Sequence, residues 1–170
     1  TPSLPPTPCS PPYCKNHMLE IHPFGPFIPP HPKYLLLGSF TTKEAIDGKT
    51  NYQWFYANGR NQFWPIMETV YRRNLKTRSE MEQLFKDVHM ALGDIILQCE
   101  RRRNSNLDIN LFNIVYDIKN ITKIISGNKL EKIFFSSRGV ENKFRRVFKD
   151  LISKHPNIEL ITLPSPSPRF

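Results

Sequence analysis

The chain has 170 residues, 39% of them hydrophobic and 23% charged, a composition that predicts one folded domain with a tail. Its 24 lysines and arginines outnumber its 15 aspartates and glutamates, which gives a formal net charge of +9. That excess favours a polyanionic partner such as nucleic acid, although a merely basic protein is the alternative. No apolar run approaches the roughly 18 residues of a membrane span, and no secretory signal is visible. Three cysteines argue against a disulfide framework and suit a reducing compartment.

The N-terminal part is rich in proline, since residues 1–32 hold eleven of the sixteen prolines. Proline fixes φ and removes a backbone donor, so an extended segment is expected there. We interpret residues 1–20 as a Pro-rich tail or cloning remnant and residues 21–170 as the domain. Cys9, Cys14 and His17 have a spacing loosely typical of zinc ligands, but no second ligand pair follows, so no metal is predicted.

The first predicted strand covers residues 33–40, a continuous apolar run that ends in Gly38-Ser39. Ligands bind just beyond such strand ends in open α/β sheets. After Asn61, apolar residues at helical spacing predict a helix that extends to Tyr71, with Asn61 as its N-cap.

Further elements follow in the second half. A capping box at Thr77 opens a second predicted helix that extends to Leu92. Residues 93–99 fit either a strand or a buried helix. Isoleucines from Ile114 to Ile125 predict a third helix. The remaining elements are a strand at 132–136, a helix at 140–151 and a strand at 158–163.

The alternation of strands and helices predicts a three-layer α/β/α sandwich with a central parallel sheet. The sequence contains neither a dinucleotide-binding glycine motif nor a P-loop, so no cofactor is expected.

Residues 55–64 read F-Y-A-N-G-R-N-Q-F-W and combine four aromatics with two asparagines and an arginine. Aromatic faces can stack on a flat polar ring, and amides can read its edge. The alternative interpretation is a turn with an asparagine helix cap and with aromatics that face the core. Both roles can hold at once.

Three motifs resemble the uracil-DNA glycosylase superfamily, and most closely its hypoxanthine-DNA glycosylase and mismatch-specific branches. They are L-G-S-F at 37–40, Y-A-N-G-R-N-Q-F-W at 56–64 and L-P-S-P-S-P at 163–168. The His-Pro-Phe segment at His22 and the Gly-Asp segment that begins at Gly93 support the resemblance. It implies a monofunctional DNA glycosylase of base-excision repair that hydrolyses the N-glycosidic bond of a flipped, deaminated base, uracil or hypoxanthine.

The resemblance also implies roles for single residues, with Asn61 as the catalytic amide. Residues expected to hold the base are Gly38, Ser39, Phe40, Tyr56 and Asn58. Residues expected to contact DNA are Ser165, Pro166, Ser167 and Arg169. The structural alternatives are core packing for Phe40, turn positions for Tyr56 and Asn58, and a frayed terminus for Arg169. Glu44 and Asp47 are interpreted as solvated loop charges.

The chain departs from the family pattern at Thr41, where a proline is usual, and at Gly59, within a segment that often reads Asn-Pro or His-Pro. It ends at Phe170, where a further helix is usual, so a C-terminally truncated copy is expected. DNA is the expected partner of a monomer located in the cytoplasm or nucleoid, or in the nucleus of a eukaryote, and no membrane association is expected. Two alternatives stay open: an inactive nucleic-acid-binding member of this fold, and a basic interaction domain with a Pro-rich tail.

Overall fold

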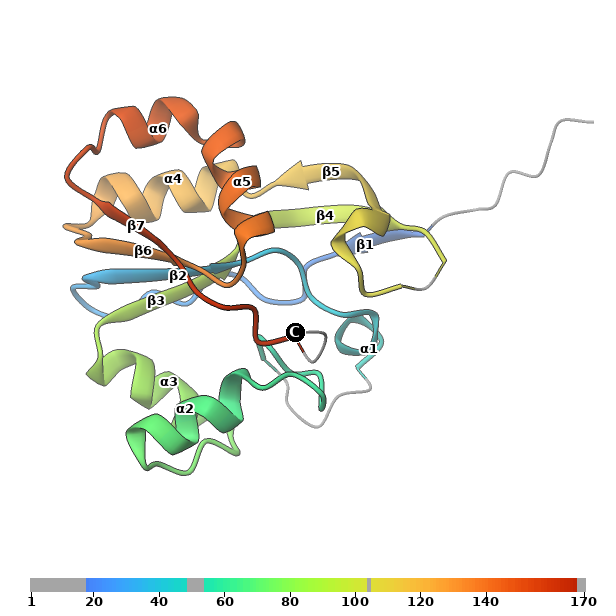
Figure 1. Ribbon diagram of the computed structural model, residues 1–170, viewed down its shortest axis with the longest axis horizontal. Helices are drawn as coiled ribbons and strands as arrows, with labels where there is room; N and C mark the ends of the chain where they lie inside the picture. Colours follow the sequence, from blue (N-terminus) through green and yellow to red (C-terminus); the bar gives the residue numbers. More distant parts are fainter. Residues whose placement is uncertain (1–17, 49–53, 104, 168–170) are drawn as a thin grey trace, which may run out of the picture.

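Two sheets of different kinds form the framework of the protein (Figure 1). The computed structural model describes residues 18–48, 54–103 and 105–167. The larger sheet has four parallel strands in the order β3-β2-β6-β7. Their bounds are Met90–Asp94 for β3, Tyr34–Gly38 for β2, Lys132–Phe135 for β6 and Glu159–Thr162 for β7. The strands predicted at 33–40, 132–136 and 158–163 are therefore confirmed.

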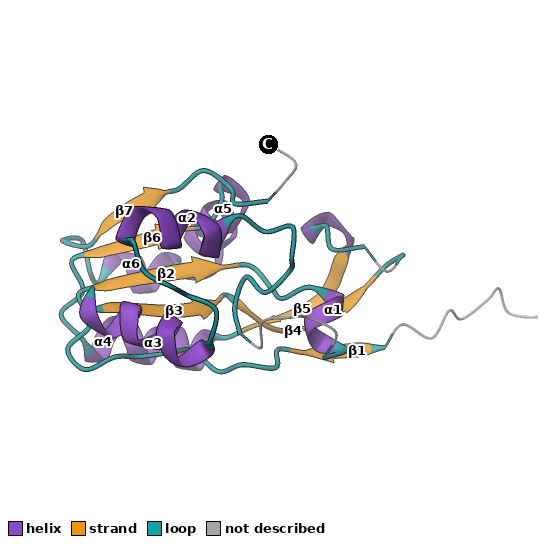
Figure 2. Cartoon of the chain, turned by 90° about the horizontal axis from the view of Figure 1, so that it is seen from below, coloured by secondary structure: helices purple, strands orange, loops and turns teal. Residues whose placement is uncertain are grey.

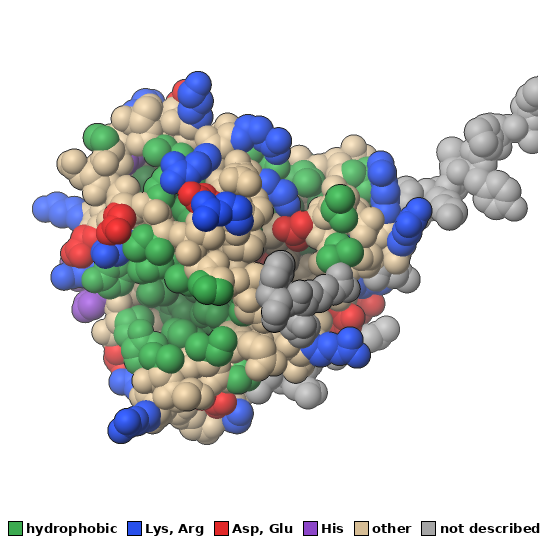
Figure 3. Space-filling model, viewed as in Figure 1, with side chains coloured by type: hydrophobic (Ala, Val, Ile, Leu, Met, Phe, Trp, Pro, Cys, Tyr) green, Lys and Arg blue, Asp and Glu red, His purple; other side chains and the backbone are tan. Residues whose placement is uncertain are grey.

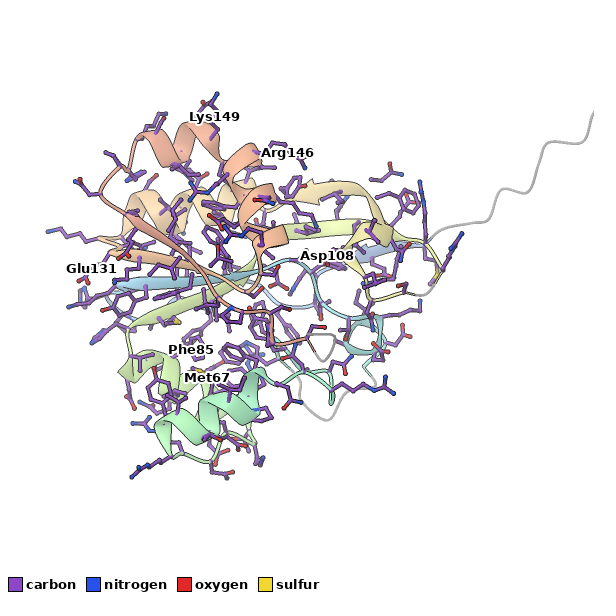
Figure 4. All side chains as sticks on the ribbon, in the orientation of Figure 1. Met67, Phe85, Asp108, Glu131, Arg146 and Lys149 are labelled. Atoms are coloured by element: carbon purple, nitrogen blue, oxygen red, sulfur yellow. The ribbon has the colours of Figure 1, made fainter. Side chains whose placement is uncertain are left out.

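Helices cover both faces of this sheet, as the three-layer prediction requires (Figures 1 and 2). Strand β2 shows why, because its side chains alternate between the two layers. Leu35 and Leu37 pack into one hydrophobic cluster with α4 and α5, whereas Leu36 packs into the other with α2 and α3. In the latter layer, Met67 of α2 and Phe85 of α3 lie close together (Figure 4).

The helices of the two layers have distinct bounds. On one face lie α2 (Phe63–Tyr71) and α3 (Arg78–Asp87). On the other lie α4 (Ile118–Gly127), α5 (Arg138–Val147) and α6 (Lys149–Ser153). A one-turn helix, α1 (Lys43–Ile46), follows β2, and a 3-10 turn, Asp108–Asn110, precedes β5. No helix in the described ranges is long and apolar enough to cross a membrane.

The smaller sheet is antiparallel, with the order β1-β4-β5. Its strands are β1 (Leu19–Ile21), β4 (Ile96–Arg101) and β5 (Leu111–Tyr116). A buried ion pair stabilises it, since Arg101 Nη2 lies 2.9 Å from Glu20 Oε2 and both side chains are almost fully buried. Two residues of β1 fall within the segment 1–20 that the sequence suggested to be a tail.

Several sequence expectations need correction. Leu92 lies in β3 and Ile114 in β5, so the second and third predicted helices end and begin elsewhere. The ambiguous segment 93–99 contains the end of β3 and the start of β4. The helix predicted at 140–151 is divided at Phe148, whose backbone leaves the helical region. Cys9, Cys14 and His17 lie outside the described residues.

Candidate active site

The candidate site begins where β2 and β3 end side by side, with Gly38 opposite Asp94. Gly38 is required here by close approach. A Cβ on residue 38 would lie 2.2 Å from Asp94 Oδ1 and 3.1 Å from the Tyr56 hydroxyl. Two oxygens from different parts of the chain therefore converge on one point above the Gly38 backbone.

Asp94 is held by His22, which lies in the segment between β1 and β2. His22 Nε2 lies 2.7 Å from Asp94 Oδ2, and the two side chains are only 3% and 8% exposed. His22 Nδ1 accepts a hydrogen bond from the Phe24 backbone N–H over 3.1 Å. The ring proton is therefore on Nε2, where it is donated to the carboxylate. Oδ1 is left to accept from another group.

Tyr56 supplies a hydroxyl to the same place. Its backbone φ is +57°, a strained value for an aromatic residue. Its ring packs on Phe63 with 4.3 Å between centroids. Burial, and then the nearby Asp94 charge, raise the pKa of Tyr56 far above its usual range, although Ser136 opposes the shift. The hydroxyl is thus a neutral group, and its contact with Ser136 falls outside normal hydrogen-bond geometry.

The loop after β2 carries Ser39 and Phe40. The Ser39 hydroxyl is buried and, within the described residues, unpartnered. Phe40 meets the His22 ring edge to face at 5.5 Å and has the Arg101 guanidinium 5.8 Å from its ring centroid. Arg101 Nη2 also donates to the carbonyl of Thr41 over 3.0 Å, so the buried ion pair of β1 and β4 fixes this loop. Phe40 therefore packs against the His22 ring and the Arg101 guanidinium.

The loop before α2 holds both asparagines in turns. Asn61 Oδ1 accepts from the Phe63 N–H over 2.8 Å, and Asn58 Oδ1 accepts from the Arg60 N–H over 2.9 Å. The N-cap position belongs to Gln62, so Asn61 caps the helix from one residue further out than predicted. Within the described chain, no acceptor binds Asn61 Nδ2.

Most aromatic side chains of residues 54–64 are buried in the hydrophobic core. Trp54 and Trp64 stack at 5.8 Å between centroids, and the Trp64 indole N–H donates to the Phe55 carbonyl over 2.8 Å. Phe63 is buried among them. Tyr56 of this stretch brings its hydroxyl to the end of β2, and the large apolar side chains around it anchor the loop.

The loop after β7 joins the site through the backbone. The Gln62 N–H donates to the Pro166 carbonyl over 3.0 Å, so residues about a hundred positions apart in sequence are in contact. Ser167 N–H donates to Ser165 Oγ over 3.3 Å, which gives this loop a local turn. The predicted DNA-contacting residues Ser165, Pro166 and Ser167 are thereby placed beside the Asn61 loop. Arg169 lies outside the described residues.

The carboxylates predicted in the first loop have no part in the site. Glu44 is exposed and accepts from Asn106 Nδ2 over 2.9 Å, and that hydrogen bond lowers the pKa of Glu44. Asp47 is the exposed C-cap of α1.

Sequence reasoning assigned no chemistry to His22 or Asp94, although both lie in segments that supported the family resemblance. The available signal was the Gly93-Asp94 pair after an apolar run. A pocket of about 80 Å³ opens beside these two residues and is lined in addition by Phe24, Asp117 and Asn120, among others. Within residues 18–48, 54–103 and 105–167, no three His, Cys, Asp or Glu side chains are grouped to hold a metal ion.

The parallel sheet with helices on both faces is an α/β fold that this chain shares with a solved structure. One solved structure with this fold is the solution NMR structure of a protein from Methanosarcina acetivorans, described as a putative uracil DNA glycosylase. The chains share 20% identity at a TM-score of 0.63, and the match covers 89% of this chain and 86% of the other. Neither a family model nor a curated protein matches the sequence.

Proposed function

We propose that this protein is a monofunctional DNA glycosylase that releases a deaminated base, uracil or hypoxanthine, from DNA in base-excision repair. The observation that carries the proposal is the convergence of Asp94 Oδ1 and the buried Tyr56 hydroxyl above Gly38. The similarity of fold to the archaeal protein supports the same reaction class.

The two oxygens suit the edge that deamination creates. Uracil and hypoxanthine both carry an N–H beside a C=O, whereas cytosine and adenine carry a ring nitrogen acceptor beside an amino group. A carboxylate can only accept, so Asp94 would receive the ring N–H, and the neutral Tyr56 hydroxyl would donate to the carbonyl. A site built to hydrogen-bond a substrate rejects analogues that leave its buried groups unpaired.

Asn61 has the role of a fixed donor. Its Oδ1 is occupied by the Phe63 N–H, so only Nδ2 is available. Water adds to C1′ as the C1′–N bond breaks, and the base leaves with the electron pair and later takes up the proton that the water loses. Preorganised N–H donors stabilise the negative charge on the departing base by several kcal/mol. In this proposal Gly38, Ser39, Phe40 and Asn58 hold the base, and Ser165 and Ser167 contact phosphates. The enzyme acts as a monomer, without a cofactor, in the compartment that holds the cell's DNA.

The test is a panel of duplexes, each with one uracil, hypoxanthine or xanthine or with only normal bases, scored for abasic sites. We expect release from at least one deaminated base and none from the unmodified duplex. Asp94→Asn is the matched variant, because an amide can also donate and should relax the selection against cytosine or adenine. Duplex binding without release from any substrate would instead favour the inactive nucleic-acid-binding alternative, and absence of both would favour the interaction-domain alternative.

A further inference from the structure

A buried carboxylate outside the candidate site organises the most basic segment of the chain. Residues 138–149 contain five cations and one carboxylate, so this short stretch carries a net charge of +4 out of the total of +9. The carboxylate belongs to Glu141, which is 6% exposed. Glu141 Oε1 accepts from Arg145 Nε over 2.8 Å, and Oε2 accepts from Arg138 Nη1 over 3.1 Å.

Both arginines form ion pairs with the Glu141 carboxylate, yet their side chains remain exposed to solvent. Their side chains are 75% exposed for Arg138 and 51% exposed for Arg145. They lie seven residues apart on α5, a spacing that places them on the same helix face. One carboxylate neutralises only one of them, so the anchored pair keeps a net positive charge.

The basic surface continues beyond this pair. Arg146 and Lys149 are exposed, and they point outward from the α5–α6 corner (Figure 4). Within the described residues, no carboxylate forms an ion pair with either. Lys143 differs, because its ammonium pairs with Asp108 over 3.2 Å. Figure 3 shows the Lys and Arg side chains gathered over α5 and α6. We call the side chains of Arg138, Arg145, Arg146 and Lys149 the α5 surface.

The α5 surface is joined to the candidate site through Glu141. The Thr162 hydroxyl donates to Glu141 Oε2, and Thr162 is the last residue of β7. The loop that follows carries Ser165 and contacts Gln62 through Pro166. Arg138 itself begins α5 just after β6 ends, at the same edge of the sheet.

We propose that the α5 surface binds the phosphate backbone of DNA outside the nucleotide in the site, with Glu141 as the residue that positions its arginines. The inference rests on the proposed function only in taking DNA as the partner. A ten-residue helix spans about 15 Å. Duplex DNA carries one charge per about 1.7 Å of axis, so several phosphates face that length.

The experiment measures binding of an unmodified duplex as a function of salt concentration. Arg146→Gln/Lys149→Gln removes two charges without touching Glu141. We expect the slope of log K against log salt to fall in magnitude by about two, since each phosphate contact contributes about 0.9. The matched control is Arg72→Gln/Lys86→Gln, which removes one exposed arginine and one exposed lysine from the layer of α2 and α3. The control should keep the slope of the parent protein.

Glu141→Gln provides a second readout that a merely structural role would not move. Glutamine removes the negative charge that holds the Arg138 and Arg145 guanidinium groups in place. If Glu141 positions these arginines, duplex binding should weaken even though the net charge of the protein rises by one. Tighter binding would show that Glu141 only neutralises the arginines and would overturn its positioning role. An unchanged slope in the α5 double variant, or equal losses in the control, would overturn the inference. If the parent protein releases a base but the α5 double variant keeps the parent's salt dependence, only the α5 surface is rejected. If the variant changes the salt dependence but the parent releases no base, only the proposed reaction is rejected.

Discussion

Asn61 and Phe63 share a hydrogen bond that leaves the Asn61 side chain with one free function. The carboxamide oxygen accepts from the Phe63 N–H over 2.8 Å at the start of α2, and the amide nitrogen has no acceptor among the described residues. The Asn61 side chain therefore caps the helix with its oxygen, and its nitrogen is the proposed catalytic donor.

Asn61→Asp separates these two ends. A carboxylate caps a helix about as well as an amide, so the fold should persist, but it cannot donate. We expect base release to fall by at least about a hundredfold, the scale for loss of one oxyanion donor, while DNA binding persists. Asn61→Ala should lose about 1 kcal/mol of stability in addition. Single-turnover release together with denaturant unfolding measures both effects, and full activity of Asn61→Asp would remove Asn61 from the reaction.

Arg101 and Glu20 form the buried pair that joins β1 to β4. Arg101→Met leaves the Glu20 carboxylate buried without a counterion, and we expect a loss of about 3–5 kcal/mol in the free energy of unfolding. The double variant Glu20→Leu/Arg101→Met removes both charges and should recover much of that loss. Urea denaturation of the three proteins decides the matter. A single variant as stable as the double one would show that the pair does not stabilise the fold.

Gly38→Ala tests the close approach of three segments. The added methyl group would lie 2.2 Å from Asp94 Oδ1, so the carboxylate must move. We expect a loss of about 1–3 kcal/mol and a fall in base release beyond what the lost stability explains. Gly139→Ala in the first turn of α5 is the control, because its nearest neighbour is the Ser137 hydroxyl at 3.7 Å. That change should be neutral or stabilise by up to about 1 kcal/mol.

Glu141 should make stability depend on pH. Hydrogen bonds from Thr162 and then Arg145 lower the pKa of Glu141 from its ordinary value of 4.5. Since the folded pKa is below the unfolded one, its contribution is present above about pH 4.5 and is lost as pH falls through the folded pKa. Unfolding free energies of the parent and of Glu141→Gln should therefore differ at about pH 7, and the difference should shrink as the pH falls below about 4.5. A difference that stays constant with pH would show that ionisation of Glu141 does not stabilise the fold.

Strands β2, β6 and β7 of the central sheet were predictable because each is a short apolar run, whereas β3 was partly assigned to the preceding helix. Leu35, Leu36 and Leu37 are all buried, one of them against a different layer from the other two. Helix α3 was predictable from its capping box, which is local chemistry. Strand β5 was not, because Ile114 happens to continue the helical spacing of α4, whereas its conformation is set by pairing with β4.

The candidate site was predictable only in part for a related reason. Tyr56, Asn58 and Asn61 belong to one short motif and could be read together. His22 and Asp94 are 72 positions apart, and neither has a local pattern that names its partner. Their contact follows from the way the segment after β1 crosses the end of β3, which is a property of the assembled chain.

The short segment from Glu20 to His22 links the two sheets through an ion pair and a hydrogen bond. Its first residue is anchored to Arg101 of the antiparallel sheet and its last to Asp94 of the parallel sheet. A shortened form of the protein that starts at Leu19 should keep both anchors, whereas one that starts at Pro23 loses both together. The N-terminal limit of the stable domain is therefore expected between Leu19 and Pro23, and cleavage between Glu20 and His22 should separate the ion pair from the hydrogen bond.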